Sequence, residues 1–156
     1  MLHAEKETEM IFKAENYIEK ISSLTLEDWK PIIELIIKIE GVEQFGDCTK
    51  AMGLLNKGII TIPQYDEHKV VLEFREAVYS IPIIIDFNWG AWDEGRKIAS
   101  DENFDFDTID IPTKCKLITA IVRNDRFCDG ALVDAFESGL ILKILKSIEK
   151  QLYYGK

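Results

Sequence analysis

Residues 117–127 read LITAIVRNDRF, and this stretch is the clearest indication of fold in the chain. Its apolar residues recur at the three- and four-residue spacing of one helix face. They are Leu117, Ile118, Ile121 and Val122. Such spacing predicts an amphipathic helix packed on an apolar core, beginning near Pro112 and ending near Asp125.

The apolar face of this helix ends in charge. Asp125 follows Ile121 by four residues, and Arg126 follows Val122 by four, so both continue the apolar stripe. Burying a charge is costly unless the charge is paired and hydrogen-bonded. We therefore expect Asp125 or Arg126 to meet an opposite charge or a backbone group, with Glu137 and Asp86 as candidate partners of Arg126.

Two interpretations of this charged segment remain open. In the structural one, a buried ion pair ties the helix end to a short helix after Gly130. In the functional one, Arg123 or Arg126 binds an anion and Asp125 orients it. The candidate polar site comprises Arg123, Asp125, Arg126, Glu137 and Asp86.

Helical patterns also occupy the N-terminal half of the chain. An amphipathic helix is predicted over residues 4–22. A second begins either at Thr25, which forms a capping box with Asp28, or at Asp28 itself. The segment Ile32–Val42 is apolar nearly all round, which is typical of a central core helix.

The rest of the chain continues this helical pattern. We predict helices over about residues 49–56, 65–80 and 92–99, between Gly130 and Gly139, and from Ile141 to Leu152. The segment Ile83–Ile85 fits a buried helix or a strand equally well. The residues Ile59–Ile62 are β-branched and could form a short extended piece.

The sequence predicts one compact, all-α, multi-helix domain spanning residues 1–156, because a chain of this length forms a single domain. The alternative is an α+β fold with one small hairpin. Hydrophobic residues make up 47% and charged residues 30% of the chain, as in ordinary globular proteins.

Net charge and apolar run lengths exclude several classes of protein. The formal net charge is −9, which argues against binding nucleic acid or an anionic membrane surface. The apolar runs are too short to cross a bilayer, and the N-terminal residues are charged where a signal peptide would be apolar. No two of the three cysteines are spaced as a CxxC motif. We therefore expect a cytoplasmic protein with reduced thiols.

Catalytic and metal-binding signatures are missing from the sequence. It contains no phosphate-binding loop, dinucleotide fingerprint, nucleophile elbow or HExxH motif. With only His3 and His68, a histidine metal site is not expected, and we predict no metal and no cofactor. The acidic run over residues 100–111 lacks the glycine and the final acid of a calcium loop, so we interpret it as solvated. Cys128 is expected to be buried and inert.

Trp89 and Trp92 would share a face if the segment is helical, since they are three residues apart. If exposed, the pair would form a candidate interaction surface, because tryptophan is a frequent interface anchor. If enclosed, both rings would complete the core. The sequence therefore favours a protein-interaction or regulatory module, with a protein partner or a homodimer formed through the last helix. The alternative is a ligand-binding protein or enzyme that uses the candidate polar site on an anionic substrate.

The C-terminal part resembles a family of uncharacterised bacterial proteins, a domain of unknown function. The resemblance rests on LITAIVR at residues 117–123, DRFCDG at 125–130, AFE at 135–137 and the residues up to Leu145. Asp86, Trp89 and Trp92 match a weaker tryptophan-containing element of that family. The resemblance does not reach the N-terminal half, and it implies no activity, substrate or cofactor.

Overall fold

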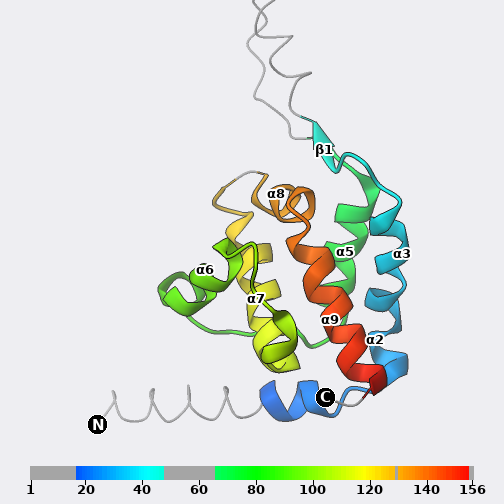
Figure 1. Ribbon diagram of the computed structural model, residues 1–156, viewed down its shortest axis with the longest axis vertical. Coiled ribbons are helices and arrows are strands. Elements are labelled where there is room, and N and C mark those ends of the chain that lie inside the picture. The colour runs from blue at the N-terminus through cyan, green and yellow to red at the C-terminus, as the bar shows by residue number, and fades with distance from the viewer. Residues whose placement is uncertain (1–16, 48–65, 129, 155–156) are drawn as a thin grey trace, which may run out of the picture.

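The computed structural model describes residues 17–47, 66–128 and 130–154. Within these ranges the fold is all-α, as predicted, with helices packed around one core (Figure 1). After a helical segment over residues 17–22, the α-helices are α2 (Leu26–Ile33), α3 (Leu35–Glu40), α5 (Lys69–Ser80), α6 (Asp93–Ser100), α7 (Ile111–Asn124), α8 (Ala131–Glu137) and α9 (Leu140–Tyr154). Two short 3-10 helices are η1 (Trp89–Ala91) and η2 (Phe106–Thr108).

Strand content in the described part of the chain is limited to one short antiparallel pairing. The strand β1 (Gly46–Asp47) pairs with β2 (Asp66–Glu67), with Gly46 opposite Glu67. The predicted helix at residues 49–56 and the extended piece at Ile59–Ile62 lie outside the described residues, as does most of the predicted helix over residues 4–22.

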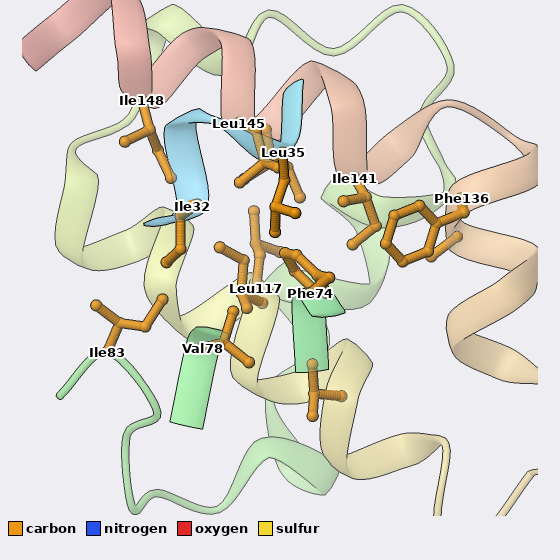
Figure 2. Packing of buried hydrophobic residues seen from close by; sticks show 14 of the residues in the cluster. Ile32, Leu35, Phe74, Val78, Ile83, Leu117, Phe136, Ile141, Leu145 and Ile148 are labelled. Carbon is orange, nitrogen blue, oxygen red and sulfur yellow. The ribbon is translucent and has the colours of Figure 1, made fainter. Parts of the chain in front are cut away.

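Helix α9 lies at the centre of the arrangement. It packs against α2 and α3 on one side and against α7, α8 and η2 on the other (Figure 1). Its buried face carries Ile141, Ile144, Leu145 and Ile148, all at the predicted helical spacing. Figure 2 shows Ile141, Leu145 and Ile148 among core residues of α2, α3, α5, α7 and α8, including Ile32, Leu35, Phe74, Leu117 and Phe136.

Local signals set several helix ends. Thr25 is the N-cap of α2: its hydroxyl accepts a hydrogen bond from the Asp28 backbone N–H, and Asp28 accepts one from the Thr25 N–H in return. The alternative start at Asp28 is therefore wrong. Gly130 and Gly139 lie immediately before α8 and α9. Their φ angles are 87° and 83°, positive values that residues with a side chain rarely adopt.

The segment Ile32–Val42 differs from its prediction in two ways. It is not one helix, because α2 ends at Ile33 and α3 begins at Leu35. It is also not buried all round, because Ile37 is 80% exposed while Ile36 and Ile39 are buried. The segment lies on the outside of the bundle, so only one face of α3 reaches the core.

The ambiguous segment Ile83–Ile85 is neither helix nor strand in the structure. Ile83 and Ile85 are buried, and α7 supplies the polar partner that the segment needs. The buried hydroxyl of Thr119 accepts a hydrogen bond from the Ile85 N–H at 3.0 Å and donates to the Cys115 carbonyl at 2.8 Å. Buried backbone groups must be paired, and a threonine from another element can do so without a sheet.

Candidate functional site

The end of α7 is built around Asp125, which is the C-cap residue of that helix. Its carboxylate accepts a hydrogen bond from the Leu132 backbone N–H at 3.0 Å, in the first turn of α8. The other carboxylate oxygen lies 3.0 Å from Nη2 of Arg75 on α5. The Asp125 side chain is only 15% exposed, so this negative charge is neutralised inside the fold.

Arg75 also binds Glu67 of β2. Its Nη1 and Nη2 atoms donate to the two Glu67 carboxylate oxygens at 3.0 and 2.8 Å. This two-point contact raises the pKa of Arg75 and fixes its plane, so the guanidinium can reach Asp125 as well. The network Glu67–Arg75–Asp125 thus joins β2, α5, α7 and α8.

Arg75, the partner of Asp125, is not among the residues that the sequence pattern singled out. The pattern that could have identified it is the one that identified Asp125: a charged residue at the helical spacing of an apolar face. Arg75 follows Val71 by four residues, and Val71, Phe74 and Val78 form the buried face of α5. A guanidinium flanking that stripe was a second charge in need of a partner.

The other members of the candidate polar site do not join this network. Glu137 accepts a hydrogen bond from the Phe45 backbone N–H at 2.8 Å, so it does not serve as the partner expected for Arg126. Arg126 is exposed, since the chain leaves the helix at Asp125, and Asp125 is the one of the two that meets an opposite charge and a backbone group. Arg123 is half-buried, and Asp86 is exposed in the segment before η1.

A separate feature lies where η1 and α6 meet α7. Trp89 and Trp92 line one groove of about 190 Å³, which we call the aromatic groove. Its residues are Trp89, Trp92, Gly95, Arg96, Ala99, Leu117, Ala120, Ile121 and Asn124. Both tryptophans are half-buried, so neither the fully enclosed nor the fully exposed arrangement describes them.

Aromatic contacts hold the two indole rings in place. The Trp92 ring meets Phe87 edge to face at a centroid distance of 5.6 Å, and Nζ of Lys116 lies 5.8 Å from its centroid. The Trp89 ring lies 5.9 Å from the ring of Phe127, which is 77% exposed. An exposed aromatic side chain that follows α7 therefore packs against Trp89 without itself lining the groove.

Gly95 allows Trp92 to lie directly on the backbone of α6. A Cβ atom at this position would overlap the indole ring, with Cζ3 at only 2.6 Å. The indole is rigid and already packed against Phe87, so it cannot make room by a small torsional change. The glycine is thus a structural requirement of the groove.

We expect Gly95→Ala to displace the Trp92 ring. Overpacking costs about 1–3 kcal/mol and the alanine recovers about 1 kcal/mol of helix propensity, so the net loss of stability is small. The main result is a shift in tryptophan fluorescence emission and in the Trp92 indole N–H resonance. Gly90→Ala is the matched control, since the nearest atom to a Cβ there is 3.9 Å away. An unmoved Trp92 resonance in Gly95→Ala would contradict this account.

Two cysteines lie in the described part of the chain, one buried and one exposed. Cys115 is buried, and this burial raises the pKa of its thiol, whereas Cys128 is exposed rather than buried as expected. In the described ranges, no group of three or more histidine, cysteine, aspartate or glutamate residues could hold a metal ion. The described helices also include none that is long and apolar enough to cross a membrane.

A family model matches residues 24–153, which include both the Asp125 network and the aromatic groove. The chain belongs to the family of unknown function DUF6508. The match extends well into the N-terminal half, so the resemblance seen in the C-terminal part was too narrow. The DUF6508 domain therefore includes α2, α3 and α5 as well as the helices that carry the tryptophans. No curated protein and no solved structure matches the chain.

Proposed function

We propose that this DUF6508 domain is a protein-interaction module that binds an apolar side chain of a partner in the aromatic groove. The observation that carries the proposal is the groove itself, which is lined by two half-buried tryptophans, together with the ring of Phe127, which lies 5.9 Å from the Trp89 ring and is 77% exposed. Exposing a large aromatic side chain beside another is unfavourable for an isolated protein in water, and it is typical of a binding surface.

The size of the groove favours a side chain over a small molecule. Its volume of about 190 Å³ is below the roughly 300–1,000 Å³ of pockets that enclose drug-sized ligands. Its walls come from η1, α6 and α7, so they are held by the core. A rigid pocket lined by tryptophan is the usual receptor for a single anchor residue at a protein interface.

Charge at the groove indicates the chemistry of the partner. Arg96 lines the groove, Arg126 is exposed next to Phe127, and Arg123 adjoins Asn124 in the groove wall. Arg96 is partly neutralised by Asp93, whose carboxylate lies 3.7 Å from its Nη1, so Arg123 and Arg126 supply the remaining positive charge next to groove residues in the sequence. We therefore propose a partner segment with an apolar anchor and a neighbouring carboxylate, which would guide its approach.

The proposal is tested by selecting from a random linear peptide library on the full chain. The selected peptides are expected to share a leucine or aromatic anchor with an aspartate or glutamate nearby. Trp89→Ala should weaken their binding by about 30-fold, the effect of removing an interface hot spot of about 2 kcal/mol. Binding is measured by fluorescence anisotropy of the labelled peptides.

Tyr154→Ala is the control for this experiment, because Tyr154 is an 84% exposed aromatic residue on α9, away from the groove. It should leave affinity unchanged. Peptides that bind Trp89→Ala as tightly as the wild type would refute the proposal. A doubling of mass in light scattering that Trp89→Ala abolishes would identify a second copy as the occupant, which also contradicts it.

The Asp125 network gives the alternative function, action on an anionic substrate, less support. Asp125 is held by Arg75 and the Leu132 N–H, and Glu137 by the Phe45 N–H. Two of the carboxylates assigned to that site thus stabilise contacts between elements of the fold.

A further inference from the structure

A second groove lies on the outer surface of the bundle, where α2 and α3 run beside α9 (Figure 1). Its volume is about 340 Å³, and we call it the α2–α9 groove. Figure 1 shows α2 and α3 on the opposite side of the bundle from α6, which forms part of the aromatic groove. The two grooves share no residue, so an inference about the second stands apart from the proposed function.

Large apolar side chains line the α2–α9 groove although water reaches them. Ile37 is 80% exposed, Tyr153 is 61% exposed and Leu26 is 49% exposed, and Ile33 beside them is half-buried. Apolar side chains that are exposed singly are ordinary on a protein surface. Four of them in the wall of one groove form a contiguous apolar patch, which is typical of an interaction site.

The spacing of the residues on α2 and α3 suits a helical partner. Four groove residues, Leu26, Lys30, Ile33 and Ile37, are separated by four, three and four positions, which is the spacing of the seam in a coiled coil. The residue between the two helices, Glu34, keeps right-handed helical backbone angles, so the seam continues from α2 into α3. Such a seam beside α9 offers a place for a third helix that carries an apolar stripe of its own.

The charged residues of the α2–α9 groove are mostly acidic. Its wall contains three glutamates, Glu27, Glu34 and Glu149, and one lysine, Lys30. The Lys30 amine already lies 3.9 Å from the Glu34 carboxylate. Among the described residues, neither Glu27 nor Glu149 has an ion-pair partner, and Glu149 is half-buried. The groove therefore places two unpaired carboxylates beside an apolar seam.

We propose that the α2–α9 groove binds an amphipathic helix of a partner protein whose apolar stripe is flanked by lysine or arginine. The stripe covers Leu26, Ile33 and Ile37, and the flanking cations pair with Glu27 and Glu149. The same charges disfavour a second copy of this chain as the occupant. A two-fold contact would bring two acidic grooves face to face, on chains that each carry a formal net charge of −9.

The test uses three fluorescently labelled peptides of about 18 residues, a length at which an isolated helix can form. The lysine peptide has leucines on one helix face and lysines on both sides of them. The glutamate peptide has glutamate in place of each lysine, and the reordered peptide has the composition of the lysine peptide with its leucines spread all round the helix. Each is titrated into the full chain and followed by fluorescence anisotropy. The lysine peptide is expected to bind at least about tenfold more tightly than either of the others.

Two substitutions locate the binding in the groove. Ile37→Ser removes the most exposed apolar side chain of the groove and should weaken binding of the lysine peptide by about tenfold or more. Leu72→Ser is its matched control, because Leu72 is a 49% exposed leucine on α5 outside the groove. Glu149→Gln keeps the shape of the side chain and removes its charge, and it should weaken binding by about threefold. Glu76→Gln, at an exposed position on α5, should leave the affinity unchanged.

Several results would overturn the proposal. They are a lysine peptide that does not bind, equal binding of the glutamate or the reordered peptide, and an unchanged affinity in Ile37→Ser. A doubling of mass in light scattering that Ile37→Ser abolishes would also overturn it, because a second copy would then occupy the groove. Trp89→Ala should bind the lysine peptide as the wild type does, so this proposal and the proposed function fail separately.

Discussion

Replacing Asp125 with alanine is expected to lower the free energy of unfolding by about 3 kcal/mol. The substitution leaves the Leu132 N–H without its acceptor and removes one of the two carboxylates that neutralise Arg75. These groups are largely enclosed, with the Arg75 side chain 27% exposed, so water can replace the lost contacts only in part. Urea denaturation followed by circular dichroism measures the loss.

Asp134→Ala provides the comparison, because Asp134 is an exposed aspartate on α8. This variant should stay within about 0.5 kcal/mol of the wild type, as surface substitutions usually do. A double-mutant cycle with Arg75→Ala separates the ion pair from the backbone contact, and it should return a coupling energy of about 1 kcal/mol or more. Equal stabilities for Asp125→Ala and Asp134→Ala would mean that the network contributes nothing.

The second large effect is a dependence of stability on pH caused by Lys114. Burial lowers the pKa of this amine from 10.5 to about 8, against the opposing attraction of Asp107, Asp110 and Asp105. Between these two pH values the unfolded chain holds a proton that the folded chain has released. Raising the pH from about 8 to 10.5 therefore favours the folded state, and below pH 8 the full penalty of a buried ammonium remains.

Lys114→Met removes this penalty, so at pH 7 it should be more stable than the wild type by about 1–3 kcal/mol. That advantage should shrink as the pH rises toward 10.5. The measurement is the difference in free energy of unfolding between the two proteins at several pH values. In this difference, the contributions of groups that titrate alike in both proteins cancel. Lys146→Met, at an exposed position, should show a constant difference. A constant difference for Lys114→Met as well would show that Lys114 is not buried with its charge.

The sequence alone determined the helical elements and several of their ends. The spacing of apolar residues predicted α5, α7 and α9 to within a few residues, and Thr25 with Asp28 predicted the capping box of α2. These features depend on neighbours within one helical turn, because backbone hydrogen bonds and side-chain caps join residues only three or four positions apart. A single stretch of chain therefore contains the information needed to predict them.

Only the tertiary structure decided what each helix face and charged group would meet. It gave Asp125 a partner on α5, Arg75, fifty positions earlier in the chain. It also exposed Ile37 and Phe127, enclosed Lys114, and brought Trp89 and Trp92 against one wall of α7. Helical periodicity says that a face is apolar or charged, but the element that covers it depends on how the helices pack. That packing is fixed by contacts between residues far apart in sequence, because only the assembled core excludes water from some faces and leaves others open.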